Sequence, residues 1–285
     1  MKNNEIELPK ITLRSYLNVL FVIANKDWKV YWRYPINALV NILNPLIWLA
    51  PIFFLGKAFS QNGEALGFAA YTGSTDYMSF LILSTAISNF TSAVFWGMGY
   101  ALKNDMDSGV LESNWMTPIP RLLILIGRTL NSLLVTSIIS LIMIILASLI
   151  FGFRTTGNIW ASVLTLIPML LGLYGFGFGF AALVMIMREA NTMVDMGQFL
   201  IDLFSGSQFP VTVLPRWLLP VALSIPLTYG YDAVRGWLLN TKTILPIQTE
   251  IQLLLVFMVV MIIAGVFVFR KLERRVRSRG TIGQY

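Results

Sequence analysis

The sequence contains no cysteine and no histidine. Without cysteine, disulfide frameworks, thiolate metal sites and cysteine nucleophiles are excluded. Without histidine, the chain lacks the commonest general base and the commonest zinc ligand. Metal-dependent or triad chemistry within this chain is therefore not expected, and the sequence offers no catalytic or metal-binding residues.

Charged residues are also scarce. They make up 12% of the 285 residues, whereas apolar residues make up 56%. Soluble domains carry about 25% charged residues, so a soluble fold of this size could not cover its surface. A lipid bilayer is therefore the expected solvent. A phosphate-binding loop of the form G-x-x-x-x-G-K-[ST] is absent as well, so the chain cannot hold ATP by that route, and no cofactor is expected in it.

Long runs without charge predict an all-α, polytopic membrane protein that forms a single domain. Crossing the hydrocarbon core takes about 20 mainly apolar residues in a helix. The predicted transmembrane spans are residues 36–55, 78–102, 122–151, 160–187, 192–206 and 251–269. The fourth span contains Gly172, Gly175, Gly177 and Gly179 without the preceding strand that a dinucleotide-binding loop requires. These glycines indicate close helix packing.

An amphipathic segment, residues 11–34, precedes the first span. Its apolar positions recur every three to four residues, and Lys, Arg, Trp and Tyr are mixed among them. This composition favours a helix that lies in the membrane interface. A soluble helix packed on a partner is the alternative. Pro35 ends the segment, because the residue before a proline is disfavoured in the helical region.

Between the fifth and sixth spans, residues 209–240 are apolar but broken by Pro210, Pro215, Pro220 and Pro226. They form either a seventh span, from Trp217 to Tyr229, or a re-entrant element on the outer side. Six spans place sixteen Lys and Arg residues on the side of the termini and five on the other. The positive-inside rule then puts both termini in the cytoplasm and favours the re-entrant element.

This distribution also explains the net charge of +7, so no nucleic-acid partner is expected. The lipid bilayer is the expected surrounding, and the cell (cytoplasmic) membrane the expected location.

Polar residues at membrane depth and the residues of a broken element are candidates for a transport pathway or gate. The polar candidates in the spans are Asn89 in the second and Asp202 in the fifth. In the re-entrant element the candidates are Phe209, Pro210, Pro226, Tyr229 and Arg235. Asp202 either lines a path or pairs with a basic residue of another span. The broken element either caps the pathway or only packs against the spans. The sequence leaves both choices open.

Three short motifs occur in order along the chain. The first is Ser108-Gly109-Val110-Leu111-Glu112 followed by Thr117-Pro118-Ile119-Pro120-Arg121; the second is residues 205–217, SGSQFPVTVLPRW; the third is residues 225–235, IPLTYGYDAVR. In these motifs and in its six-span layout, the chain resembles the ABC-2 type transporter permeases. Val110 stands where the family more often has Thr.

The resemblance implies a permease subunit of an ATP-binding cassette exporter. It would form the translocation path with a second permease, identical or related. Two separate ATPase subunits would bind ATP and Mg, so this chain would not itself be an enzyme. Residues 103–118 would contain the coupling helix, braced by the N-terminal helix. The coupling residues implied are Asp107, Gly109, Val110, Leu111, Glu112, Thr117, Pro118 and Arg121.

The residues of this stretch suit a docking role on their own account. Its acids can form ion pairs with basic residues of a partner, while Val110, Leu111 and Trp115 offer an apolar anchor. Two other classes of function stay open. One is an ion-coupled secondary transporter that uses Asp202, and the other is a membrane anchor for a cytoplasmic enzyme. No residue selects among drugs, peptides, lipids, glycans and ions as substrate.

Overall fold

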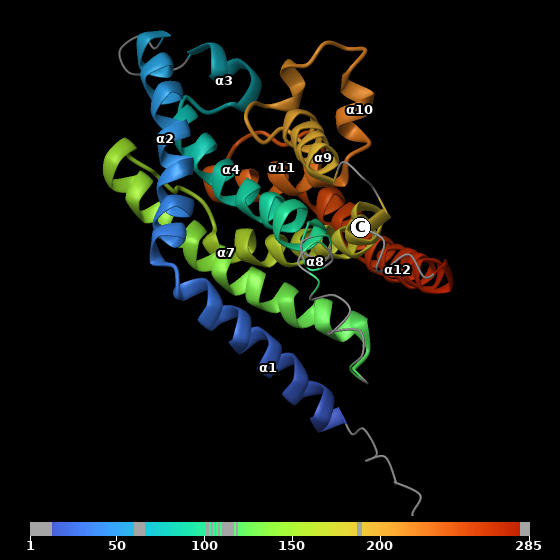
Figure 1. The fold of residues 1–285 in the computed structure, drawn as a ribbon. Coiled ribbons are helices and arrows are strands. Elements are labelled where there is room, and N and C mark those ends of the chain that lie inside the picture. The colour runs from blue at the N-terminus through green and yellow to red at the C-terminus, as the bar shows by residue number, and fades with distance from the viewer. Residues whose placement is uncertain are drawn as a thin grey trace, which may run out of the picture.

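The computed structural model describes residues 13–59, 66–100, 103, 105, 107, 109, 117, 119–186 and 190–279. Within these ranges every regular element is a helix and no strand occurs, as the sequence predicts. The helices form one elongated bundle, with α1 extending from it (Figure 1). A largely apolar core joins α4, α7, α8, α11 and α12.

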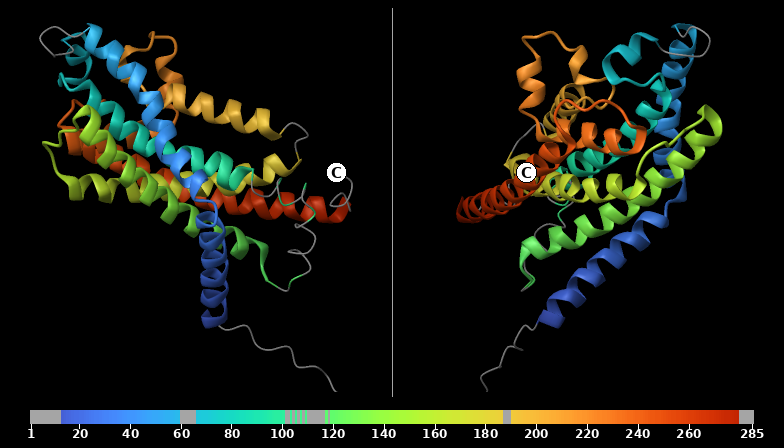
Figure 2. Two further views of the ribbon diagram at one scale, coloured as in Figure 1. Left: turned by 60° about the vertical axis from the view of Figure 1, so that its left-hand side comes forward. Right: turned by 180° about the vertical axis from the view of Figure 1, so that it is seen from behind.

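Five helices are long and apolar enough to cross a membrane. They are α2 (Pro35–Phe59), α4 (Tyr77–Ser92) with its π-helical continuation η1 (Ala93–Gly99), α7 (Arg121–Phe151), α8 (Ile159–Ile186) and α12 (Ile247–Arg279). Most of them run along a common direction (Figure 2). They correspond to the first four predicted spans and the last one.

The predicted fifth span, residues 192–206, is a shorter helix. Helix α9 (Ala190–Phe204) has 15 residues. At 1.5 Å per residue it is about 22 Å long, less than the hydrocarbon core of about 30 Å. It runs beside α4, in the direction of the long helices (Figure 2). The helix is therefore confirmed, and its crossing of the membrane stays a prediction.

Helix α12 continues well beyond the predicted end of the last span at residue 269. It runs unbroken through the basic segment to Arg279. Lys, Arg and Glu are good helix formers, so the change in composition ends the apolar stretch without ending the helix.

The amphipathic N-terminal segment forms α1 (Leu13–Trp32). It runs beside α7 in Figure 1 and at an angle to the long helices in the left-hand view of Figure 2. Its position in the membrane interface stays a prediction. Helix α1 packs mainly against α7, where Gly127 permits a close approach. A Cβ at Gly127 would lie 2.9 Å from Cγ2 of Ile23. Several apolar side chains of α1 stay exposed, among them Leu17, Phe21 and Val22.

The proline-rich segment after α9 is divided as its prolines predict. It contains η2 (Val211–Val213), α10 (Leu219–Leu223) and α11 (Pro226–Leu239). The chain leaves the helical conformation at Ile225, immediately before Pro226, so no continuous helix joins Trp217 to Tyr229. That finding argues against the seventh span. Helix α11 is largely buried and packs on α8 and α12.

The glycines of α8 do serve helix packing. A Cβ at Gly175 would lie 2.7 Å from the backbone nitrogen of Ile262 in α12, and one at Gly265 would lie 1.9 Å from the carbonyl oxygen of Gly175. Any larger residue at either position would force the two backbones apart. The contact between α8 and α12 is the most extensive helix pairing among the described residues.

Candidate transport pathway and coupling surface

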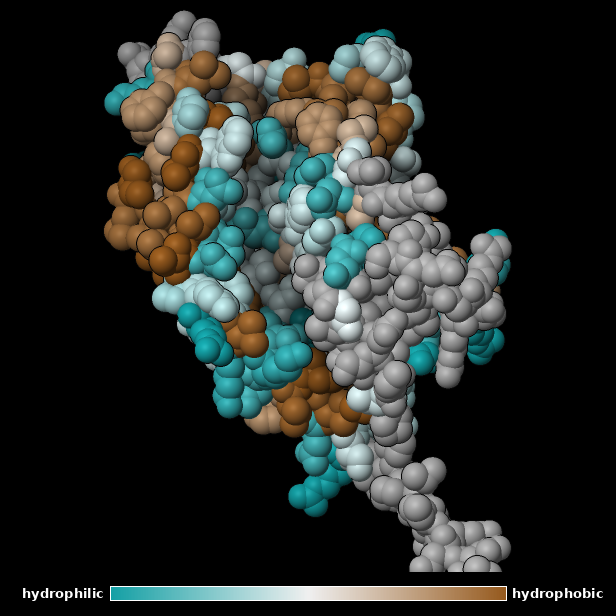
Figure 3. Space-filling view, in the orientation of Figure 1, coloured by the Kyte–Doolittle hydropathy of each residue, from teal (hydrophilic) through white to brown (hydrophobic). Residues whose placement is uncertain are grey.

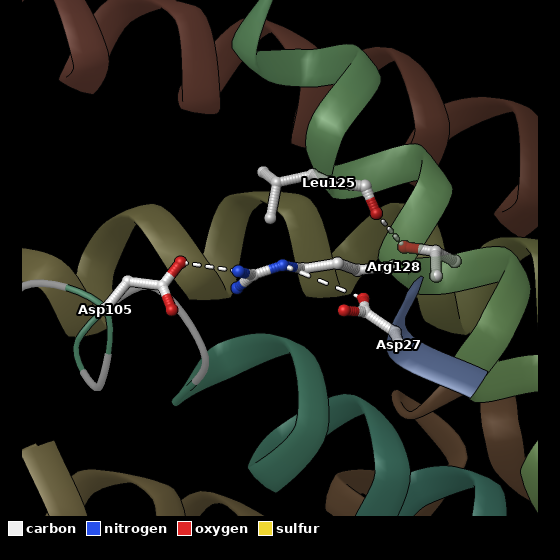
Figure 4. Close-up of polar contacts among 5 residues, drawn as sticks. Asp27, Asp105, Leu125 and Arg128 are labelled. Atoms are coloured by element: carbon white, nitrogen blue, oxygen red, sulfur yellow. Dashed lines mark hydrogen bonds and ion pairs between the residues drawn. The ribbon is translucent and has the colours of Figure 1, made fainter. Parts of the chain in front are cut away.

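The start of α7 and the Arg- and Lys-rich C-terminal part of α12 lie at the same end of the bundle. We refer to this end of the bundle as the basic end. There, the guanidinium of Arg128 lies between two acids from different parts of the chain (Figure 4). Its Nη2 is 2.7 Å from Oδ2 of Asp105, and its Nε is 4.0 Å from Oδ2 of Asp27. Arg128 thus connects α7 to α1 and to the stretch that the sequence predicts as the coupling region.

The positive charge of Arg128 does not fully offset the effect of burial on the Asp27 carboxyl. Burial raises the pKa of the Asp27 carboxyl above its usual range, and Arg128 and Lys26 lower it only in part. The contact at 4.0 Å is long for an ion pair, whereas Asp105 is well placed. Asp105 is therefore the main partner of Arg128.

The predicted coupling stretch begins as a helix. Lys103, Asp105 and Asp107 are helical, and Nζ of Lys103 lies 2.8 Å from Oδ1 of Asp107, one turn later. Gly109 has φ +69°, a left-handed conformation in which glycine commonly ends helices. Asp107 and Gly109 therefore lie at the end of a helical segment. Val110, Leu111, Glu112 and Pro118 lie outside the described residues.

Arg121 forms an ion pair with Glu273 of α12. Together with Thr117, Tyr16 and Arg270 these residues line a surface cavity of ≈ 570 Å³ at the basic end. Of the coupling residues that the sequence implies, Arg121 therefore contacts the last helix of its own chain. The structure thus provides two polar links at this end, one through Arg128 and one through Arg121.

At mid-bundle, Asp202 of α9 is held by neutral groups. Ser88 Oγ donates a hydrogen bond to its Oδ1 (2.8 Å), and Gln198 Nε2 donates one to its Oδ2 (3.4 Å). No Lys or Arg of the described ranges forms an ion pair with Asp202. The alternative in which it pairs with a basic residue of another span is therefore wrong for the described residues.

A polar cavity of ≈ 570 Å³ opens among α1, α2, α4, η1 and α7. Its lining is rich in amide and hydroxyl groups and includes one exposed indole; the residues are Asn41, Asn44, Asn89, Ser92, Trp96, Asn131, Ser132 and Thr136. Arg128 and Asp27 close it at the basic end. On one face of the bundle, a recessed hydrophilic strip lies beside apolar surface (Figure 3).

The candidate residue Asn89 belongs to this cavity. Its Nδ2 donates a hydrogen bond to Ser140 Oγ of α7 (3.2 Å), and Ser140 in turn donates to the carbonyl of Ala86 (3.1 Å). The amide therefore joins α4 to α7 at the cavity wall. The hydrogen bonds show a packing role for Asn89, and its role in a pathway stays a prediction.

The remaining candidates lie at the opposite end of the bundle. Pro226 begins α11, and Tyr229 donates a hydrogen bond to the carbonyl of Leu223 (2.8 Å). Phe209 is half-buried and stands before Pro210, which starts the turn into η2. The hydrogen bond of Tyr229 joins α11 to α10 within the broken segment.

Arg235 is the exception among these candidates, because it is 3% exposed and joins three segments. Its Nε donates to Ser84 Oγ of α4 (3.0 Å), and its Nη2 donates to the carbonyls of Gly206 (2.6 Å) and Ser207 (3.2 Å). Its Cζ lies 3.6 Å from the ring centroid of Phe80. The side chain thus fastens α11 to α4 and to the end of α9.

Sequence reasoning did not select Arg128 or Trp96 as site residues. Arg128 was visible as a charge near the start of the third span, the kind of residue that deserves a functional reading by default. Its acid partners were not predictable, because they come from distant segments. The π-helical turn η1, which carries Trp96, has no recognisable sequence signature.

A multi-pass bundle with a polar cavity and a helical loop linked to its long helices is the architecture of a membrane transport protein. The chain belongs to the ABC-2 type transporter family, whose model matches residues 18–239. It is 24% identical over 242 residues to a putative transport permease, ycf38, of Porphyra purpurea, covering 83% of this chain and 79% of that protein. It is 26% identical over 152 residues to the probable doxorubicin resistance ABC transporter permease protein DrrC of Mycobacterium tuberculosis, covering 51% of this chain and 53% of that protein.

Proposed function

We propose that this chain is the permease subunit of an ATP-driven exporter, coupled to separate ATPase subunits through residues 103–118. Membership of the ABC-2 type transporter family and the permease names of its relatives support the general role. One observation carries the coupling assignment. Arg128 connects Asp105, within the proposed coupling stretch, to the third long helix at 2.7 Å.

The link makes the stretch suited to transmit force. Displacing Asp105 would pull on Arg128 in α7, and Asp27 of α1 lies at the same guanidinium. Further along, Arg121 and Glu273 fasten the start of α7 to α12. An ATPase pair that binds two arrangements of this loop with different affinity would shift the permease between two states.

The polar cavity is the proposed half-pathway. Its Asn and Ser side chains can hydrate a passing solute, and Trp96 offers an aromatic surface. A second permease subunit would complete the path. Helix α2 exposes large apolar side chains, since Ile47 and Trp48 are 66% and 70% exposed. Lipid or a second subunit would cover this face of α2.

In this proposal both termini are cytoplasmic, and the cell membrane is the location. The broken segment of residues 209–240 is a re-entrant cap on the outer side. Two ATPase subunits bind ATP and Mg at the basic end, whose Arg and Lys residues follow the positive-inside rule. The chain itself performs no hydrolysis.

Reconstitution tests the proposal against its main competitor. The permease is placed in proteoliposomes with a candidate ATPase subunit. Uptake of a panel of fluorescent drugs into inverted vesicles is then followed with ATP, without ATP, and after ion gradients are collapsed. The proposal requires uptake that depends on ATP and survives the collapse. Uptake that does not depend on ATP and is lost when the ion gradient is collapsed would identify an ion-coupled transporter that uses Asp202. No uptake with any probe, combined with stable ATPase binding, would favour a membrane anchor.

A further inference from the structure

A further cavity, of ≈ 310 Å³, lies at the opposite end of the bundle from the coupling stretch. It is formed by the end of α3 (Leu66–Thr72), the turn after α9, α11 and the segment that leads into α12. The backbone nitrogen of Lys242 donates to the carbonyl of Thr72 (2.8 Å), which fixes the mouth of the cavity. We refer to it as the Arg235 cavity.

The buried guanidinium of Arg235 in this cavity has no carboxylate in contact. No acid among the described residues lies within 4.0 Å of it, and its hydrogen bonds go to a hydroxyl and to carbonyl oxygens. These bonds use Nε and Nη2 and leave Nη1 uncommitted within the described residues. The charge of Asp232 acts on Arg235 from beyond contact distance. A buried cation without an acid in contact is costly, so an anion bound against Arg235 would be stabilised there.

The nearest acid is engaged elsewhere. Asp232 also lines the cavity, and its Oδ2 accepts a hydrogen bond from the backbone nitrogen of Ile244 (2.6 Å). It is the one acid among the described lining residues, against two cations. Arg235 and Lys242 leave the cavity with a positive balance.

Two hydroxyl groups in the wall have no partner. Ser205 is 0% exposed and Thr241 is 8% exposed, both line the cavity, and neither side-chain oxygen has a hydrogen-bond partner among the described residues. Buried polar groups are nearly always satisfied, so unpartnered hydroxyls beside an uncommitted guanidinium need an explanation. They are donors, as are Arg235 and Lys242.

We propose that the Arg235 cavity binds a phosphate-type oxyanion, with Arg235, Ser205, Thr241 and Lys242 as donors. Donors from four separate positions suit an anion with three or more acceptor oxygens better than a carboxylate with two. The phosphate can belong to a soluble molecule or to the headgroup of an outer-leaflet lipid. The mouth has exposed Tyr71 and Lys242 and is accessible to either source.

The test measures the thermal stability of the purified full-length chain in detergent, without the ATPase. Inorganic phosphate is titrated at constant ionic strength against chloride. Phosphate should raise the Tm of the wild type, and the midpoint of this effect should move to about tenfold higher phosphate in the Ser205→Ala/Thr241→Val double variant. The double variant loses no hydrogen bond among the described residues, because neither hydroxyl has a partner there. Lys242→Gln, an exposed position, gives a second variant that retains the fold.

Arg216→Gln removes an exposed cation of the same broken segment and should respond as the wild type does. If inorganic phosphate has no effect, bilayers of phosphatidylglycerol are compared with bilayers of a neutral glycolipid. Stabilisation by the phospholipid that weakens in the double variant and in Lys242→Gln would identify a headgroup site. The proposal is overturned if neither form of phosphate stabilises the wild type, or if all variants respond equally. Because no ATPase takes part, this result is independent of the proposed transport function.

Discussion

Arg128 and Asp105 meet at 2.7 Å, although Arg128 lies within α7 and Asp105 lies in the stretch that precedes this helix. Their side chains are only 20% and 14% exposed, so the pair is protected from water and salt. In the proposed function, this contact would pass a displacement of the stretch on to α7. The first prediction concerns its removal.

Arg128→Met should destabilise the chain by about 2–3 kcal/mol, because it leaves two largely buried acids without their cation. It should also reduce ATP-dependent transport more than it reduces ATPase binding. Thermal unfolding in detergent and flux in proteoliposomes measure the two effects. Arg154→Met, at an exposed position of the opposite end, is the matched control. A double-mutant cycle with Asp105→Asn should give a coupling energy of about 1 kcal/mol or more; strict additivity would rule out the contact.

The contribution of Asp27 to folding stability should change with pH in the opposite direction from that of an acid held in a close ion pair. Its pKa is raised by burial above the ordinary value of 3.8. The folded state therefore holds the proton more tightly than the unfolded state, and stability falls as pH rises through the window above 3.8. Above that window the penalty is constant. Asp27→Asn should thus be at least as stable as the wild type at neutral pH.

The stability advantage of Asp27→Asn should shrink in acid. Tm is measured across a pH series for the wild type and for Asp27→Asn, with Asp105→Asn for comparison. Asp105→Asn should be the less stable variant at neutral pH, because it removes the 2.7 Å contact with Arg128. A neutral-pH loss of stability in Asp27→Asn larger than that in Asp105→Asn would contradict the assignment of the main partner.

The pairing of α8 with α12 should tolerate no side chain at its closest point. Gly175→Ala places a methyl group 2.7 Å from the backbone of Ile262 and should cost about 1–3 kcal/mol or more. Gly179→Ala, one turn later on the same helix, meets no atom nearer than 3.6 Å and should be close to neutral. Equal Tm values for the two variants would mean that α8 and α12 do not pack as described.

Asp202→Asn should leave ATP-dependent transport within about threefold of the wild type. The asparagine oxygen can still accept the hydrogen bond of Ser88, so the change should cost at most about 1 kcal/mol of stability. Flux is measured with ATP present and with the ion gradients collapsed, and Ser88→Ala serves as a control for the contact. Complete loss of flux in a stable Asp202→Asn protein would support ion coupling through this residue.

The sequence predicts most of this fold because its strongest signals are local. Uncharged runs give the five long helices, and the prolines at 210, 215, 220 and 226 give the broken segment, since a proline acts on its own neighbourhood. Helix α12 extends past the predicted span of residues 251–269, because hydropathy marks where a segment leaves the apolar region, whereas helix propensity decides where the helix ends.

The site is less predictable, because its contacts join distant segments. Asp27, Asp105 and Arg128 are separated widely in sequence, and their convergence depends on how α1 crosses α7. Asp202 hydrogen-bonds Ser88 and Gln198 in place of the cation that one of its two readings predicts, and its role in lining a path stays a prediction. Ser88 and Gln198 are uncharged, so a search of the sequence for a cation could not identify them as partners of Asp202.

ATP hydrolysis by the partner ATPase, with and without this chain in proteoliposomes, tests the central claim most directly. The account predicts that the wild-type permease changes the ATPase rate, and that Val110→Asp and Glu112→Ala reduce this change while the Tm of the permease stays the same. An ATPase rate that is identical without permease, with wild type and with both variants would contradict the coupling role of residues 103–118.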